Sequence, residues 1–494
     1  AQDEKVRILR CLENWIDIVD IDINTLHKYS ILSYICSRLC ASQGEEFECL
    51  CELVVVCMKR YRPINKNHGT AVPEEGTFTT LLSYTLLLLP KWSELLSHLQ
   101  RERYATFEEI DEEVMSCARA LVRIFTEAAE QTLYMYQRYQ TLPHPSEGSN
   151  GEGRGGEFIT LCKVLLGVGR VPLDPNIIRI PLKFFYDLSL ALVPLDNAGD
   201  DGGWDEGYDN NNGGAGAAYA PPAALVLAYK PLYYELLEIA TFNIQIPPAI
   251  LTSGTNDATP SSLPSYIQES RDVWRECILD CLAVVGGAEG FEWGCRGLES
   301  RATALSSQTT PNNQAWSEVE ALLFTLSITL QRLNPLQPHP YLPQLLPLLC
   351  SLPTHLLYIN VSILNCIASV CPHLHDNLKH TYVFIERVVR HMLPSARTST
   401  PAFSALQMQA CKTLLSILQA HREHRPLFSL HPPPSGMPPL PPIHLSALPP
   451  IPSPLFAPPS TSPPTPPSLP TLLHLIFTLS ACGVLGAGAG VGAG

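Results

Sequence analysis

Apolar residues recur every three to four positions in three successive blocks between Trp316 and Leu393. Each block predicts a helix with one apolar face, because residues three or four apart lie on the same side of a helix. A helix cannot bury such a face by itself, so each one needs helices packed beside it. The apolar positions of the three predicted helices are Val319, Leu322, Leu323, Leu326 and Leu330; Leu356, Ile359, Ile363, Ile367 and Val370; and Val383, Ile385, Val388, Val389 and Met392.

The same pattern over most of the 494 residues predicts an all-α solenoid of the HEAT or armadillo type. In this fold class, antiparallel helix pairs of roughly 40 to 47 residues stack into a right-handed superhelix. The chain is too long for one compact core, and no segment alternates with the period of two that is typical of a β-sheet. Stacked helix pairs fit both observations and create an extended surface that can hold other proteins.

Two stretches, residues 1–195 and 225–424, are interpreted as runs of HEAT repeats. The helical pattern begins at once in VRILRCLENWIDI, and we therefore expect the chain to be a piece whose true beginning is missing. Pro90 is expected to kink or divide a long apolar helix, because proline lacks the N–H that a helix interior uses. Residues 336–351 are interpreted as a proline-rich break between two helices.

Residues 196–224 differ from the segments on either side. They are acidic and glycine-rich, with too little apolar surface to fold alone, and this composition predicts a disordered insertion between helices. The alternative to a solvated linker is an acidic loop that contacts a basic cargo or regulator. The candidate contact residues, chosen from charge alone, are Asp200, Asp201, Asp205, Glu206 and Asp209.

Proline dominates residues 425–470, which predicts an extended low-complexity linker. Residues 471–494 follow with a short apolar helix and a Gly/Ala tail. That apolar run is shorter than a membrane span needs and contains His474. We interpret it as a last repeat helix, with a membrane tail anchor as the alternative.

The net charge of −14 disfavours direct binding to nucleic acid, since binding to a duplex requires Lys and Arg to neutralise phosphates. An acidic receptor for basic proteins is easier to reconcile with this charge. The sixteen cysteines occur without the paired C-x-x-C spacing of a zinc site. They are expected to be reduced, buried packing residues, as in a cytosolic or nuclear protein.

Catalytic and cofactor-binding motifs are missing from the sequence. It has no Walker lysine motif, no H-E-x-x-H and no G-x-S-x-G, and Gly167-x-Gly169 is only a fragment of a dinucleotide loop. The histidines His373, His375 and His380 lie near predicted helix ends, where a capping role is expected. The sequence therefore predicts a protein without enzymatic activity, cofactor or metal, and without contact to a membrane.

Several colinear segments between Val6 and Ala420 resemble the central repeats of karyopherins, the importin-β superfamily, on the branch of the SR-protein transportins. One block has the form RCL-x-x-W, and others resemble that branch's R-I-F-T-E-L and W-x-x-x-E-A-x-L-F helices. The segments that carry the resemblance are ILRCLENWIDI, EFECLCELVVVCMKRY, LVRIFTEAAEQTL, NIIRIPLKFFYDLSLAL, WSEVEALLFTLSITL and INVSILNCIASVCPHL.

The resemblance implies a HEAT-repeat nuclear transport receptor that shuttles between nucleus and cytoplasm under the control of Ran-GTP. Its implied cargo is basic protein, including serine/arginine-rich and other RNA-binding proteins, with nucleoporins as further partners. The repeats that make most Ran contacts in the superfamily are missing from this chain, and the branch's arginine-rich cargo helix has no counterpart here. Cargo identity, import versus export and oligomeric state stay open, and a non-transport HEAT or armadillo scaffold or adaptor is the alternative.

Overall fold

The computed structural model describes residues 2–19, 28, 30–60, 82–83, 85–102, 109–139, 142, 154–171, 173–193, 223–253, 263–306, 313–334, 339–352, 356–373 and 412–413. Every regular element within these ranges is a helix. The chain divides into two units. Unit 1 consists of Ala1–Ile246 and Leu263–Gly297, and unit 2 consists of Pro247–Ser262 and Leu298–Gly494.

Unit 1 contains all the described helices up to α13, apart from α12, and the first half of α14. The helices of unit 1 are α1 (Gln2–Val19), α3 (Ile31–Ala41), α4 (Gly44–Arg60), α6 (Leu89–Glu102), α7 (Glu112–Tyr139), α8 (Arg154–Val168), α9 (Pro175–Arg179), α10 (Leu182–Leu192), α11 (Ala223–Asn243) and α13 (Ser265–Val285). The division between the units falls inside α14 (Gly287–Ser306).

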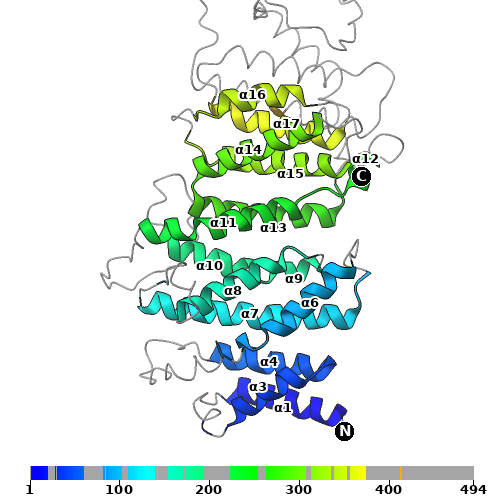
Figure 1. Cartoon of the computed structure of the whole chain (residues 1–494), viewed down its shortest axis with the longest axis vertical. Coiled ribbons are helices and arrows are strands. Elements are labelled where there is room, and N and C mark those ends of the chain that lie inside the picture. The colour runs from blue at the N-terminus through cyan, green and yellow to red at the C-terminus, as the bar shows by residue number, and fades with distance from the viewer. Residues whose placement is uncertain are drawn as a thin grey trace, which may run out of the picture. The chain divides into compact units, whose positions relative to one another are not determined.

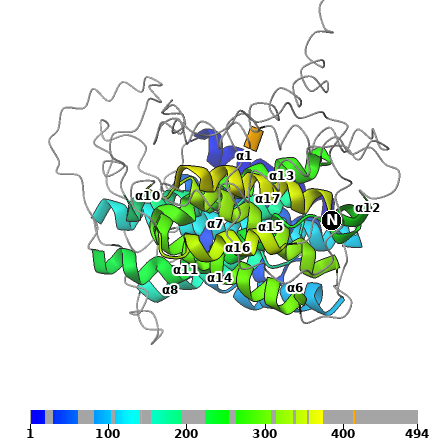
Figure 2. The ribbon, with the colours of Figure 1, turned by 90° about the horizontal axis from the view of Figure 1, so that it is seen from above.

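The helices of unit 1 lie in two layers. In the first layer α4 packs on α7, α7 on α10, and α10 on α13, as successive rows (Figure 1). In the second layer α8 packs on α11. Three contacts join the two layers: α6 packs on α7, α8 packs on α7, and α11 packs on α13. Figure 2 shows α6, α8 and α11 along one side of α7, α10 and α13. Helices α7, α8, α11 and α13 therefore each have a neighbour in their own layer and another in the opposite layer.

Large side chains fill the space between these layers. The rings of Phe158 on α8 and Phe184 on α10 meet edge to face, with their centroids 5.9 Å apart. Tyr233 of α11 is fully buried, and its hydroxyl donates a hydrogen bond to the carbonyl of Phe185 at 2.8 Å. Burying an aromatic or aliphatic side chain of this size contributes about 1.5–3 kcal/mol. The amphipathic stripes thus supply the core of unit 1.

The helices of unit 2 repeat with a regular offset. This unit holds the remainder of α14 and α12 (Pro248–Ser253), α15 (Asn313–Leu330), α16 (Leu342–Ser351), α17 (Leu357–Val370) and the 3₁₀ helix η4 (Cys371–His373). The α15–α17 contacts are Ser362 Oγ to Glu320 Oε1 at 2.5 Å, Cys366 Sγ to the Leu323 carbonyl at 3.0 Å and His373 Nε2 to the Leu330 carbonyl at 3.0 Å. The partners are 42, 43 and 43 residues apart, so α15 and α17 run parallel. An offset of this size is typical of one HEAT repeat.

The same kind of contact recurs once more beyond α17. The hydroxyl of Thr413, which is fully buried, donates to the carbonyl of Leu364 at 3.1 Å, across a separation of 49 residues. The backbone carbonyl of a helix residue thus accepts from a side chain one repeat later, as Leu323 accepts from Cys366. The packing of unit 2 continues at least as far as Thr413.

One expectation about proline in the sequence is wrong, and one is confirmed. Residues 336–351 are not merely a break, because α16 forms there with Pro343 in its first turn and Pro347 inside it. The segment NIIRIPLKFFYDLSLAL forms two helices, α9 and α10, which are separated at Ile180 and Pro181. Pro181 cannot donate the hydrogen bond that would continue α9. Pro90 does divide the apolar segment, since it lies in the first turn of α6, where a missing N–H costs nothing.

The described residues cover only part of the expected architecture. The predicted helix after Asp376, most of the insertion 196–224, the linker 425–470 and the segment 471–494 lie outside them. Of the three histidines expected to cap helix ends, His373 is described. It is buried and contacts the carbonyl of Leu330, the last residue of α15, which confirms the capping role.

Gly286 ends α13 with a backbone φ of +98°, which L-residues rarely adopt. Replacing it with alanine is expected to lower the free energy of unfolding by about 1 kcal/mol through backbone strain. No heavy atom lies within 4 Å of the position that a Cβ would take, so steric clash adds nothing. Urea denaturation should give the same loss for Gly286→Ala and Gly286→Ser, whereas a loss that grows with side-chain size would contradict this reasoning.

Candidate protein-binding surface

Charged side chains line the seams between the helices of the first layer of unit 1. Arg10 of α1 binds Glu45 of α4 at 2.7 Å, and Arg123 of α7 binds Glu52 of α4. The next pair joins Glu130 of α7 to Lys183 of α10. The steps from α1 to α4, from α4 to α7 and from α7 to α10 are therefore each crossed by an ion pair. Pairs as exposed as these each contribute less than about 1 kcal/mol, so they fix register more than they add stability.

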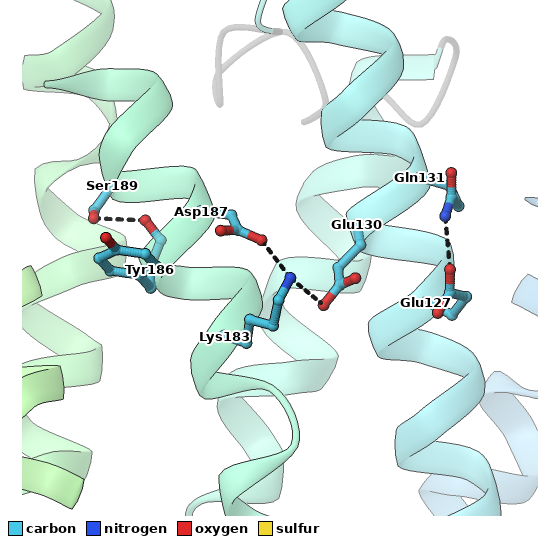
Figure 3. A network of polar contacts seen from close by, with 7 residues as sticks. All are labelled: Glu127, Glu130, Gln131, Lys183, Tyr186, Asp187 and Ser189. Carbon is cyan, nitrogen blue, oxygen red and sulfur yellow. Dashed lines mark hydrogen bonds and ion pairs between the residues drawn. The ribbon is translucent and has the colours of Figure 1, made fainter. Parts of the chain in front are cut away.

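Lys183 of α10 is the centre of the network in Figure 3. Its ammonium group lies 2.8 Å from Asp187 Oδ2 on the same helix and 3.6 Å from Glu130 Oε1 on α7. Tyr186 is 43% exposed, and Glu130 is mostly covered. On the other side of α7, Gln131 Nε2 donates to the buried carboxylate of Glu127 at 2.6 Å. The α7–α10 seam is thus closed by polar groups that bind one another.

Helix α13 carries a different arrangement, which we call the carboxylate stripe. It consists of Glu269, Asp272, Glu276 and Asp280, spaced three, four and four residues apart. This spacing places the four groups on one face, over roughly 16 Å of helix. The opposite face of α13 bears the buried residues Arg271, Trp274, Ile278 and Cys281. The carboxylate stripe therefore points away from the core, with Glu269, Asp272 and Glu276 exposed and Asp280 half-buried.

The carboxylate stripe also differs from the other seams in its partners. Among the described residues, no ion pair joins Glu269, Asp272 or Glu276 to a cation, and Asp272 accepts only from the Gln268 amide at 3.1 Å. Arg275 follows Asp272 by three residues and is exposed, and within the part of the chain that the structure describes no ion pair joins the two. A row of carboxylates without cations produces a negative potential that attracts basic segments of other molecules.

Burial affects the acid–base properties of several groups in unit 1. Desolvation raises the pKa of the Glu52 carboxyl, and the guanidinium of Arg123 opposes that effect. Burial also raises the pKa of the Tyr136 hydroxyl to about 12, with a smaller contribution from Glu157. Lys230 lowers the pKa of Glu289 through a hydrogen bond between α11 and α14. Each shift has a structural cause in helix packing.

The thiols do not have the properties of catalytic nucleophiles. Cys162 and Cys281 are fully buried, and burial raises the pKa of both thiols well above the ordinary value. The described cysteines are unbridged, and most of them are buried, as expected for packing residues. The part of the chain that the structure describes contains no cluster of His, Cys, Asp and Glu that could hold a metal ion. None of its helices has the length and hydrophobicity to cross a membrane.

The sequence analysis placed the candidate contacts elsewhere. Asp200, Asp201, Asp205, Glu206 and Asp209 all lie outside the described residues, so they remain a prediction. The carboxylate stripe was missed, although its signal is present in the sequence. The segment ESRDVWRECILD has acidic residues at the helical spacing of three and four, interleaved with an apolar stripe.

The comparisons with known proteins give a structural match only. No protein-family model and no curated protein sequence matches the chain. A solved structure titled "Importin13 cytosolic state" matches with a TM-score of 0.58 and 15% sequence identity, over 85% of this chain. The chain has the fold of a HEAT-repeat solenoid. It spans 42% of the length of that importin-13 chain. The prediction of an all-α solenoid is therefore confirmed, and an identity this low is informative about the fold alone.

Proposed function

We propose that this chain is the central part of a nuclear transport receptor of the importin-β superfamily. The observation that supports the proposal best is the match to importin-13 over 85% of the chain. The colinear segments that resemble the SR-protein transportin branch also support it. In this proposal the protein is not an enzyme, shuttles between nucleus and cytoplasm, and binds cargo proteins, Ran-GTP and nucleoporins.

The carboxylate stripe supports basic protein as the cargo class. Three of its carboxylates have no cationic partner among the described residues, and they point to the solvent from the first layer. An arginine-rich segment would supply the missing cations, because guanidinium groups bind carboxylates with two parallel hydrogen bonds. The insertion carboxylates Asp200, Asp201, Asp205, Glu206 and Asp209 are proposed as a second, independent contact for the same cargo.

The proposed mechanism is a change in the curvature of the solenoid. Each repeat contacts only its neighbours, so small rotations between repeats add up along the array. Cargo and Ran-GTP would bind conformations that exclude one another, which requires different affinities for the two shapes. Ran-GTP would act mainly through repeats outside this chain. If the two ligands exclude one another, as proposed, Ran-GTP would release cargo; a receptor in which both favour one conformation would instead take up cargo together with Ran-GTP.

If the carboxylate stripe binds cargo, neutralising it should weaken the binding of a basic peptide. The triple variant Glu269→Gln, Asp272→Asn, Glu276→Gln is expected to bind a fluorescent peptide of Arg-Ser repeats about tenfold more weakly at low salt, equivalent to about 1.4 kcal/mol. Fluorescence polarisation measures this, and the difference should shrink as salt screens the charges. The three positions are exposed, so folding is not expected to change.

The matched control removes the same number of charges from the second layer. Glu94→Gln and Glu102→Gln on α6, combined with Glu238→Gln on α11, alter exposed carboxylates of that layer. This control should bind the peptide like the unmodified chain. If both triple variants lose affinity equally, net charge rather than the carboxylate stripe attracts the peptide. Unchanged affinity in the first variant removes α13 from the cargo site.

Control by Ran is tested separately from cargo binding. The full-length protein of which this chain is proposed to be the centre is immobilised with bound Arg-Ser cargo, and Ran is added in its GTP-locked or GDP form. A transport receptor should bind Ran-GTP selectively, with a change in cargo affinity. A HEAT or armadillo scaffold, the alternative function, should ignore the nucleotide, and that outcome would overturn the transport proposal while leaving the fold intact.

A further inference from the structure

Of the helices that the structure describes, α14 alone contains residues of both units. Its first half, as far as Gly297, belongs to unit 1, and its second half, from Leu298, belongs to unit 2. The chain also passes between the units after Ile246 and before Leu263, and both of those points lie between helices. A helical backbone therefore joins the two units at one position, inside α14.

Each half of α14 is bound to its own unit by charged side chains. In the first half, Glu289 accepts a hydrogen bond from Lys230 Nζ and another from the Tyr234 hydroxyl at 3.1 Å, and both donors lie on α11 of unit 1. In the second half, Arg301 Nε lies 2.6 Å from Glu318 Oε2 on α15 of unit 2. The two halves of one helix thus have partners in different units.

The division coincides with a weak point of the helix. Glycine occupies positions 287, 290, 294 and 297 of α14, and no glycine follows Gly297 in the second half. Each glycine in a helix interior disfavours the helical state about fivefold relative to alanine, because its backbone has more freedom to lose. Gly290 and Gly294 are buried, whereas Gly297 is half-buried. The least restrained of these glycines is therefore the one next to the division.

We propose that α14 is a hinge, which bends at Gly297 so that units 1 and 2 move as separate bodies. Hinges concentrate a large change of φ and ψ in a few residues, while the elements on either side keep their own contacts. The hinge would place at one position a bend that a solenoid can otherwise spread over many repeats. It requires neither cargo nor Ran, so it is tested on the free chain and can fail without affecting the proposed function.

Distances between two spin labels measure the bending. One label is placed at Lys163 of α8 and the other at Gln344 of α16, both exposed, through non-natural amino acids because the chain has sixteen cysteines. Gly297→Ala should narrow the distribution of distances, since the bent population is expected to fall about fivefold. Ser300→Gly, at an exposed position of the second half, should broaden it.

Gly167→Ala is the matched control, because it makes the same change inside α8, which lies wholly in unit 1. It should leave the distribution between the units unchanged. A second pair of labels within unit 1, at the exposed positions Glu102 and Leu227, should give one distribution in every variant. If Gly167→Ala narrows the distribution between the units as much as Gly297→Ala does, general stability controls the bending and the hinge is refuted.

Hydrogen exchange shows where α14 opens. Amides of residues 295–300 should exchange faster than the central amides of α13, and Gly297→Ala should slow them about fivefold. Protection of these amides equal to that of α13, or label distributions that neither Gly297→Ala nor Ser300→Gly changes, would mean that α14 is a rigid helix and would overturn the proposal.

Discussion

Replacing Arg271 with alanine is expected to lower the free energy of unfolding of unit 1 by about 3 kcal/mol, the largest effect that we expect from a single charged residue. Arg271 lies in the first half of α13 and is only 4% exposed. Its Nε donates to the carbonyl of Ile244 at 2.9 Å, just past the end of α11. The carbonyls at the end of a helix lack intrahelical donors and carry partial negative charge, so a buried guanidinium binds them well.

Two variants separate the causes of this loss. Arg271→Met keeps most of the side-chain volume but removes every donor, so it should lose about 1–2 kcal/mol through the unpaired carbonyl. Arg271→Ala adds the cavity, and the difference between the two variants measures packing. Arg275→Ala, on an exposed face of α13, should stay within about 0.5 kcal/mol of the unmodified chain. Urea denaturation followed by circular dichroism gives these values, and equal stability of the Arg271 and Arg275 variants would contradict the capping role.

Hydrogen exchange locates the effect within the array. Repeat proteins can unfold in parts because each repeat contacts only its neighbours. Amides of α11 and α13 should exchange faster in Arg271→Ala, whereas those of α15 and α17 in unit 2 should keep their rates. Faster exchange in both units would mean that Arg271 acts on more than the α11–α13 pair.

The helices that the sequence predicted best are those whose stability depends on one local stripe. Ile359, Ile363 and Ile367 of α17 are all fully buried, as their spacing indicates. Such a stripe predicts a helix whichever helices become its neighbours, because any neighbours have to cover the same apolar face. The fold class could therefore be inferred before any contact was known.

Helix α14 was not predicted, because its sequence has poor helix propensity. Glycine occurs at 287, 290, 294 and 297, and each glycine in a helix interior costs about 1 kcal/mol relative to alanine. Phe291, Cys295 and Leu298 nevertheless lie on one buried face, and their burial outweighs the propensity. Helix α16 forms despite Pro347 for the same reason, since Leu345, Leu346 and Leu349 are buried.

The charged contacts could be predicted only in part. The pair Arg123–Glu52 joins residues 71 apart, and their proximity depends on which helices become neighbours. No local pattern encodes that choice. The carboxylate stripe of α13 could have been found, because its spacing is local to one helix, but its lack of cationic partners is visible only in the structure.

Gly169→Ala is expected to lower the free energy of unfolding by about 2 kcal/mol, although it adds a single methyl group. A Cβ at Gly169 would lie 2.4 Å from Ile239 Cγ2 and 3.7 Å from Trp274 Cη2. Ile239 and Trp274 are 4% exposed and belong to α11 and α13, so neither can move away freely. Asn243 Nδ2 also donates to the Gly169 carbonyl at 2.8 Å, which holds the turn after α8 close to α11.

Gly167 provides the matched control, two residues earlier in the chain. It lies inside α8, and the atom nearest to its added Cβ is Leu96 Cδ1 at 4.0 Å, an ordinary contact. Gly167→Ala should therefore raise stability by about 0.5–1 kcal/mol through helix propensity. The same chemical change is thus expected to have opposite signs at two neighbouring positions, and a loss at both would show that α8 tolerates no side chain for reasons other than the contact with Ile239.

A double-mutant cycle identifies the clashing atom. Ile239→Ala removes Cγ2 and on its own should destabilise the chain by about 2–5 kcal/mol by leaving a cavity. In the Gly169→Ala background the new methyl group occupies part of that cavity, so the double variant should be more stable than the sum of the two single losses by at least about 1 kcal/mol. Urea denaturation of the four proteins measures this coupling. If the two losses simply add, the positions are not coupled, and the backbone of the turn after α8 moves to accommodate the methyl group. In that case the contact with Ile239 does not restrict the residue type at position 169.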